Sequence, residues 1–233
     1  MAKSNVFKVA LLTTIAFIAS FSATTAWAQG GSSVTAQAFA IFYGTHITGS
    51  RANIWTAQQP ANWWAIASPV AVCTTQPNCT GYLVETGFVK GTVTPTPNVL
   101  QQFVSWWGLG VPADMDFVGI PLQDNTWYEF RVEQCDLGTT NWCAYIGNTN
   151  VHTFTNLGFN YGLLAGCGGE GGGGGVPMGV YCYNPQWRDT LANGLNWNLY
   201  NYNYTQINSL VPPHQYCVLG GFTTYGSYSY KCN

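Results

Sequence analysis

The chain has 233 residues, with seven basic and nine acidic side chains, a net charge of −2 at neutral pH and only 7% charged residues. No basic patch is present, which excludes the usual electrostatic footprint of a nucleic-acid-binding protein. The length is sufficient for one sizeable hydrophobic core, and all-β proteins of this size are often single domains.

Residues 1–28 are predicted to be an export signal. Lys3 and Lys8 provide a positive start, an apolar run follows, and the small residues at Ala26–Ala28 predict cleavage before Gln29. We therefore expect a mature chain, 29–233, of 233 − 28 = 205 residues, secreted to the extracellular or periplasmic space. The apolar run is short for a membrane span, and no later stretch is long and apolar enough, so no membrane association is expected after cleavage.

After the signal, short alternating, aromatic or β-branched runs follow one another, separated by Gly, Pro and Asn. Ten segments are predicted as strands: 33–44, 63–72, 81–91, 98–108, 126–135, 142–148, 151–158, 179–184, 195–207 and 227–232. Their number and spacing favour an all-β protein, a two-sheet antiparallel β-sandwich of the jelly-roll or concanavalin-like kind. One domain is expected over 29–233.

The segment 81–91 contains a carboxylate among apolar and very small neighbours. Strand alternation places Glu85 on one face together with Leu83, Gly87 and Val89. Desolvation there would raise the pKa of the carboxyl, which makes Glu85 a candidate functional group. The alternative is an edge-strand glutamate that reaches water.

The segment 126–135 has one predicted buried face and one wet face. Its aromatic and β-branched residues occupy the even positions 128–132, while Glu129, Arg131 and Glu133 take the other face. We expect these three to form a solvated or groove-lining ladder that contributes little stability. The following CDLGTTNWC predicts a hairpin turn clamped by its two cysteines.

The stretch LLAGCGGEGGGGGVPMG, 163–179, holds nine glycines and a single carboxylate, Glu170. We predict a loop here. The absence of side chains around Glu170 would let a substrate backbone approach closely, with Gly168 and Gly169 beside it.

All eight cysteines follow the export signal, and an even count in an exported chain implies disulfides. Connectivity cannot be derived from the sequence, but pairing in sequence order is expected because each neighbouring pair closes a short loop. The cysteines are Cys73, Cys79, Cys135, Cys143, Cys167, Cys182, Cys217 and Cys232. No Cys-x-x-Cys occurs and the three histidines are scattered, so neither a metal site nor a cofactor is expected.

Several catalytic chemistries lack their motifs. No Gly-x-Ser-x-Gly elbow is present, and the Gly-rich stretch lacks the Lys-Ser/Thr ending of a phosphate-binding loop. Most of the nine acids resemble turn or ladder residues, which leaves Glu85 and Glu170, each flanked by glycine or small residues. A pair of carboxylates is a candidate for acid–base chemistry.

The motifs YLVETGF around Glu85 and GCGGEGG around Glu170 resemble the two glutamate motifs of the neprosin family of glutamic peptidases. Their order and spacing are also similar to those of the fungal glutamic peptidases, the eqolisins. There a Gln-Thr-Gly strand supplies the first catalytic residue, and Glu85 would stand at the glutamine. Both families are two-sheet sandwiches with the active site on the concave face of one sheet. The similarity in layout extends from Trp55 to Cys182, although glycines replace the tryptophan and acidic residues expected beside the second glutamate.

The resemblance implies that Glu85 and Glu170 are a catalytic pair acting on a peptide or protein. In such a pair one carboxylate activates a water, while the protonated partner stabilises the oxyanion. Activity would peak at acid pH, and which glutamate plays which part stays open because coupled groups share their titration. The substrate-binding residues implied are Trp55, Trp106, Trp107, Gly168 and Gly169.

The leading hypothesis is a secreted, monomeric, acid-acting glutamic endopeptidase with no nucleic-acid partner. One alternative is a lectin-like carbohydrate-binding β-sandwich whose aromatic side chains line a groove. The other is a structural or surface-assembly protein, which low charge and abundant Tyr, Asn and Gly would suit. A separation of one water between the two carboxylates would favour the peptidase, and opposite faces of the fold would exclude it.

Overall fold

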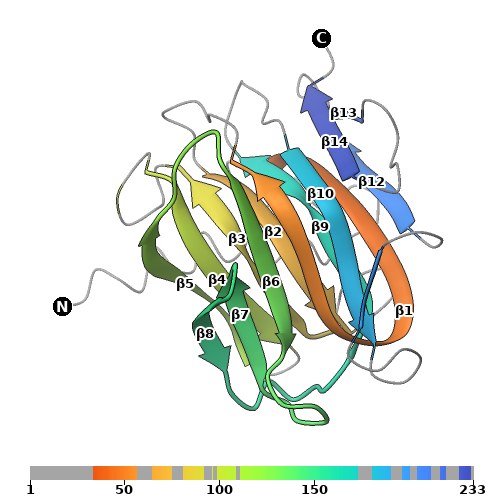
Figure 1. Cartoon of the computed structure of the whole chain (residues 1–233). Coiled ribbons are helices and arrows are strands. Elements are labelled where there is room, and N and C mark those ends of the chain that lie inside the picture. Colours follow the sequence, from red (N-terminus) through yellow and green to blue (C-terminus); the bar gives the residue numbers. More distant parts are fainter. Residues whose placement is uncertain are drawn as a thin grey trace.

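In the computed structural model, the described residues form fourteen strands, and all paired strands run antiparallel (Figure 1). The model describes residues 34–56, 65–74, 81–91, 96, 99–108, 111–172, 180–189, 196–199, 204–210, 216–218 and 226–231. The predicted export signal, 1–28, lies outside them. Within them there is no helix long and apolar enough to cross a membrane.

The strands follow one another along the chain with few long connections between them. They are β1 (Val34–Trp55), β2 (Ala65–Cys73), β3 (Leu83–Lys90), β4 (Gln101–Gly108), β5 (Val111–Pro121), β6 (Trp127–Gln134), β7 (Trp142–Ile146), β8 (Thr149–Phe154), β9 (Gly162–Gly172), β10 (Val180–Asp189), β11 (Trp197–Leu199), β12 (Tyr204–Leu210), β13 (Tyr216–Val218) and β14 (Gly226–Lys231).

The long strand β1 joins two sheets. Its first part pairs with β9 and β12, which completes a first sheet in the order β5-β4-β3-β2-β9-β1-β12. Its second part pairs with β6 and β10, which gives a second sheet in the order β8-β7-β6-β1-β10, with β14-β13 and β11 beyond β10. In Figure 1, β6 and β10 lie in front of β2, β3 and β9. The predicted all-β sandwich is confirmed.

The core lies between the two sheets. Val84, Val104 and Ala165 of the first sheet pack with Val132 and Trp142 of the second in one cluster of buried residues. A second cluster surrounds Ile54, Phe88 and Phe130 and includes the half-cystines Cys167 and Cys182. Apolar residues at every second position of both sheets therefore meet, as strand alternation requires.

The disulfides that are described follow sequence order. Cys135–Cys143 clamps the β6–β7 hairpin, as predicted, and Cys167–Cys182 connects β9 of the first sheet to β10 of the second. Cys73 is also disulfide-bonded. Its expected partner Cys79 lies outside the described residues. Cys232 of the expected Cys217–Cys232 pair also lies outside them.

The Gly-rich stretch is a strand over 162–172 and not the predicted loop. It runs between β1 and β2, whose backbones supply hydrogen bonds on both sides. Close packing explains the glycines at least at Gly162, where a Cβ atom would collide with Val72 and lie 2.7 Å from the carbonyl oxygen of Cys73. Residues 173–179 lie outside the description.

Other strand segments were also not predicted: the second part of β1, β5 and the short β13 (Tyr216–Val218). The second part of β1 passes through a Gly- and Asn-containing sequence that resembles a turn, yet it continues as a strand into the second sheet. The strand β5 contains two prolines and two aspartates, which are poor strand formers, but it lies at the edge of the first sheet. An edge strand tolerates proline because one row of its N–H groups is not needed for pairing.

Candidate active site

Glu85 lies on the outer face of the first sheet. Val84 and Phe88 of β3 belong to the core between the sheets, so alternation directs Glu85 to the opposite side, as predicted. Glu85 is 0% exposed, and Leu83 and Val89 on the same face are also fully buried. We call this surface the Glu85 face.

Short side chains surround Glu85 across the sheet. The backbone register aligns Ser105 of β4, Glu85 of β3, Ala71 of β2 and Gly166 of β9 in one row. Gly87 comes next on the same face of β3. Between β4 and β9, Glu85 is therefore the longest side chain of its row.

The two carboxyl oxygens of Glu85 have different surroundings. The Ser105 hydroxyl donates a hydrogen bond of 2.6 Å to Oε1, while Oε2 is buried and has no hydrogen-bond partner among the described residues. Burial raises the pKa of Glu85 to about 8, and the Ser105 hydrogen bond opposes this shift only in part. At neutral pH the group is therefore protonated. With Oε1 accepting from Ser105, the proton on Oε2 is free to be donated.

Glu170 shares this face by backbone register. Its position in β9 is opposite Ala67 of β2 and Gln37 of β1, and Ala67 lies four residues from Ala71 along β2. Four residues correspond to about 13 Å along a strand, and two strand spacings to about 10 Å across the sheet. The α-carbons of Glu85 and Glu170 are thus on the order of 16 Å apart, on the same face and on opposite sides of β2.

Two of the predicted substrate-binding positions belong to the Glu85 face. Trp107 is opposite Leu83 in the register of β4 and β3, and Gly168 is opposite Phe39 in the register of β9 and β1. Gly169, one residue further along β9, falls on the alternate face of the strand.

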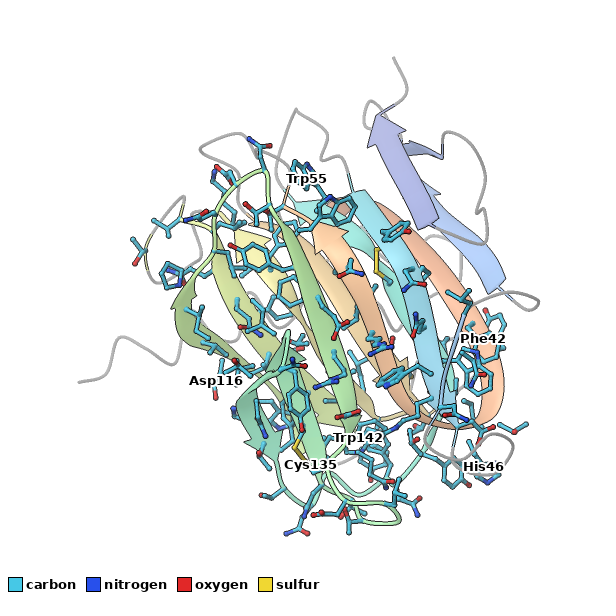
Figure 2. All side chains as sticks on the ribbon, viewed as in Figure 1. Phe42, His46, Trp55, Asp116, Cys135 and Trp142 are labelled. Atoms are coloured by element: carbon cyan, nitrogen blue, oxygen red, sulfur yellow. A yellow bond between two sulfur atoms is a disulfide. The ribbon has the colours of Figure 1, made fainter. Side chains whose placement is uncertain are left out.

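Trp106 and Trp55 do not reach the Glu85 face. Trp106 lies between the sheets, where its ring stacks on His152 at 5.6 Å and meets Phe154 edge-on at 5.2 Å. Trp55 lies at the end of β1 in the second sheet and packs against Trp127 at 5.4 Å (Figure 2). The expectation that they line a site around Glu85 is corrected: alternation turns Trp106 inward, and β1 carries Trp55 into the other sheet.

Ser105 was not identified from the sequence. The stretch QQFVSWW reads as an apolar strand, and its hydroxyl becomes significant only when β3 and β4 pair with Ser105 opposite Glu85. A cross-strand pair depends on register, which alternation within one strand does not determine.

The described groups around Glu85 suit proton transfer. A neutral carboxyl can donate a hydrogen bond to a carbonyl oxygen, and its conjugate base can accept a proton later in a reaction. In the parts of the chain that the structure describes, no group of three or more His, Cys, Asp or Glu side chains could hold a metal ion.

No protein-family model and no curated protein matches the sequence. Solved structures, however, match the fold. Scytalido-glutamic peptidase with a transition-state analogue inhibitor aligns with a TM-score of 0.60 and 13% identity, over 85% of this chain and 100% of that one. SCP-B, an eqolisin-family peptidase in complex with the tripeptide Ala-Ile-His, aligns with a TM-score of 0.51 and 15% identity, over the same shares.

The fold is shared with the eqolisin peptidases. At 13–15% identity the similarity concerns the path of the chain and does not extend to the activity. It confirms the two-sheet sandwich that the eqolisin resemblance implies. The resemblance to the neprosin family remains a prediction from the two glutamate motifs.

Proposed function

We propose that this chain is a secreted glutamic endopeptidase that binds a peptide or protein on the Glu85 face and is active below the pKa of about 8 at which Glu85 loses its proton. The observation that carries the proposal is the state of Glu85: a fully buried carboxyl with one oxygen held by Ser105 and the other without a described partner. This carboxyl belongs to the Glu-Thr-Gly motif that resembles the eqolisin Gln-Thr-Gly. The fold of the chain is similar to that of the eqolisin peptidases.

In the proposed reaction, Glu85 is the proton-bearing group and Glu170 the base. Glu170 takes a proton from a water molecule, and the water oxygen attacks the carbonyl carbon of the peptide. The Oε2 hydroxyl of Glu85 donates a hydrogen bond to the oxygen on which negative charge develops. As the C–N bond breaks, the proton held by Glu170 passes to the leaving amine. The products are one carboxylic acid and one amine.

The distance along β2 restricts how the pair can operate. Ser105 holds the Glu85 carboxyl on the β4 side of β3, whereas Glu170 lies on the other side, across β2, so the Glu85 side chain would have to turn away from Ser105 to act with Glu170 on one bond. Paired carboxyls of some glycosidases act across a water at about 6.5–9.5 Å, so direct contact between carboxyls is not required. Because Glu85 is 0% exposed, a substrate reaches it only when this face is uncovered.

Peptide cleavage by the exported protein, measured from about pH 2 to about pH 9, tests the proposal. Glu85→Ala should lower kcat by about 10²–10³-fold, since it removes the donor to the oxyanion. Glu85→Gln keeps an N–H donor that does not titrate, so it should retain more activity and lose the alkaline decline associated with a pKa of about 8. Glu170→Gln should lower kcat by about 10²–10⁴-fold because the base is lost.

Asp136→Asn, in the exposed β6–β7 turn, is the matched control and should cleave like the wild type. Unchanged cleavage by Glu85→Ala would remove Glu85 from the mechanism, and unchanged cleavage by Glu170→Gln would remove Glu170. A wild-type protein that cleaves no peptide at any pH would reject the peptidase.

A further inference from the structure

The three arginines of the chain gather on the outer face of the second sheet, away from Glu85. Arg131 belongs to β6, Arg51 to β1 and Arg188 to β10, and these strands are neighbours. Ile54 of β1 and Phe130 of β6 point into the core. Arg51 and Arg131 are an odd number of positions away along the same strands, so alternation directs them outward. We call this surface the arginine face.

Two of these arginines are directly opposite each other. Arg51 pairs with Arg131 in the register of β1 and β6, and the same row continues to Tyr145 on β7 and Gln186 on β10. Like charges at directly opposed positions destabilise a sheet. The arrangement therefore has a cost that an anion between the two guanidinium groups would remove.

Aromatic rings and Gln186 hold the opposed arginines in place. Arg51 donates two hydrogen bonds to Gln186 Oε1, at 3.0 and 2.7 Å, and its guanidinium lies 4.5 Å from the ring centre of Trp197. Arg131 lies 4.1 Å from the ring centre of Tyr145. Gly49 makes room for Trp197, since a Cβ atom there would come within 2.8 Å of the indole.

The carboxylates of this face pair most closely with Arg188 and less closely with the other two arginines. Arg188 donates to Glu133 at 2.8 Å and to two backbone carbonyls, which makes it a structural pair. Glu133 is then 3.7 Å from Arg131, and Glu129 is 3.9 Å from Arg51. The buried Nε of Arg188, like that of Arg131, has no hydrogen-bond partner among the described residues. The charged groups of this face are thus three arginines, two glutamates and, near Tyr145, Asp136 of the adjacent turn.

An aromatic shelf continues the same face. Trp127 and Tyr183, each 46% exposed, lie 6.1 Å apart, and Trp127 also packs on Trp55. Trp127 is four residues from Arg131 along β6, or about 13 Å. Trp55 is visible at this end of the sandwich in Figure 2. A ligand that touches both the shelf and the arginines must be an oligomer and not a single small anion.

We propose that the arginine face binds an acidic polysaccharide, with an anionic group of one sugar between Arg51 and Arg131. Planar guanidinium groups match a carboxylate or sulfate in geometry and charge. Sugar rings stack on the faces of Trp127 and Tyr183. Asn53 lies opposite Glu129, in the row between the arginines and Trp127, and offers hydrogen bonds to sugar hydroxyl groups. The proposal is independent of the proposed peptidase, because the two faces are on opposite sides of the sandwich.

Binding of the full exported chain to polygalacturonate, measured by calorimetry, tests the proposal. The wild type should bind polygalacturonate, bind the same polymer about tenfold more weakly when its carboxylates are methyl-esterified, and lose affinity at about 0.5 M salt. Dextran sulfate in a parallel titration distinguishes the anion, since tighter binding there assigns a sulfate, and weaker binding assigns a carboxylate.

Variants locate the site. Arg131→Gln should weaken binding to polygalacturonate about tenfold, and Arg131→Lys should weaken it less, because it keeps the charge and loses only the fork of N–H donors. Trp127→Ala should weaken binding to the acidic and the esterified polymer alike. Lys90→Gln, which removes one positive charge from β3 in the other sheet, is the matched control and should bind like the wild type.

Equal affinity for the acidic and esterified polymers would overturn the proposal, as would equal affinity of Arg131→Gln and Lys90→Gln. Binding of polyglutamate as tight as that of polygalacturonate would reject the saccharide in favour of an acidic peptide. Absence of binding to both polygalacturonate and dextran sulfate would also reject the proposal.

Discussion

A carboxyl group without exposed surface is stable only when it holds a proton or meets a positive charge. The described residues around Glu85 provide one hydroxyl and several apolar or glycine neighbours, and no cation. The protonated form is therefore favoured on folding, as desolvation predicts. The same property that makes Glu85 a candidate proton donor gives it a measurable effect on stability.

The stability of the wild type should fall as the pH rises from about 4.5 to about 8. The folded protein keeps a proton on Glu85 in this range and the unfolded chain does not, so the free energy of unfolding falls by up to about 1.4 kcal/mol per pH unit. Glu85→Gln carries no titrating proton and should have a flatter profile. Thermal midpoints across this range measure the difference, with Asp136→Asn as control. Parallel profiles for Glu85→Gln and wild type would contradict the raised pKa.

At the level of elements, β9 connects the proposed active site of the first sheet to the second sheet. It lies between β1 and β2, contributes Gly166 to the row of Glu85, and carries Glu170. Its Cys167 is bonded to Cys182 of β10 within the core, so β9 fixes the first sheet to the second. A strand with so many glycines has little side-chain packing to fix its register, and this bond supplies a constraint.

Removal of the Cys167–Cys182 bond by the double change to alanine should lower the free energy of unfolding by about 3 kcal/mol or more. A 15-residue separation predicts about 3 kcal/mol from chain entropy, and the loss of two buried sulfurs adds to it. The double change at Cys135 and Cys143, with a separation of 8, is the control and should cost about 2.5 kcal/mol. Urea denaturation compares the two. A smaller loss for the pair between sheets would mean that β9 is held by its backbone pairing alone.

For the molecule as a whole, the sandwich separates two surfaces of different chemistry. The Glu85 face of the first sheet is apolar and buried around one carboxyl, whereas the arginine face of the second sheet is charged and aromatic. The packed core between them contains no path of charged groups among the residues of its two clusters. The two surfaces should therefore act independently.

The double variant Glu85→Gln/Arg131→Gln should behave as the sum of its single changes. Distant sites without shared partners add within about 0.5 kcal/mol, and we expect this for the free energy of unfolding. Peptide cleavage should respond only to Glu85→Gln and polygalacturonate affinity only to Arg131→Gln. Altered cleavage in the single variant Arg131→Gln would show that the faces are coupled.

The sequence by itself determined which residues alternate and what each face of a strand contains. Alternation in 81–91 identified Glu85 as a carboxyl among apolar and small neighbours, and alternation in 126–135 identified the outward row that contains Arg131. The disulfide of the β6–β7 hairpin also followed from the sequence, because its cysteines flank a short turn. These features are local, since they depend on residues close together in the chain.

Tertiary structure alone decided which strands are neighbours and in which register. Nothing within 101–108 indicates that Ser105 meets Glu85, and nothing near Arg51 indicates that it opposes Arg131, 80 positions later in the sequence. The strand nature of β9 likewise comes from β1 and β2, which pair with a glycine-rich backbone that has little strand preference of its own. Contacts between distant segments depend on how the whole core packs, and no single segment contains that information.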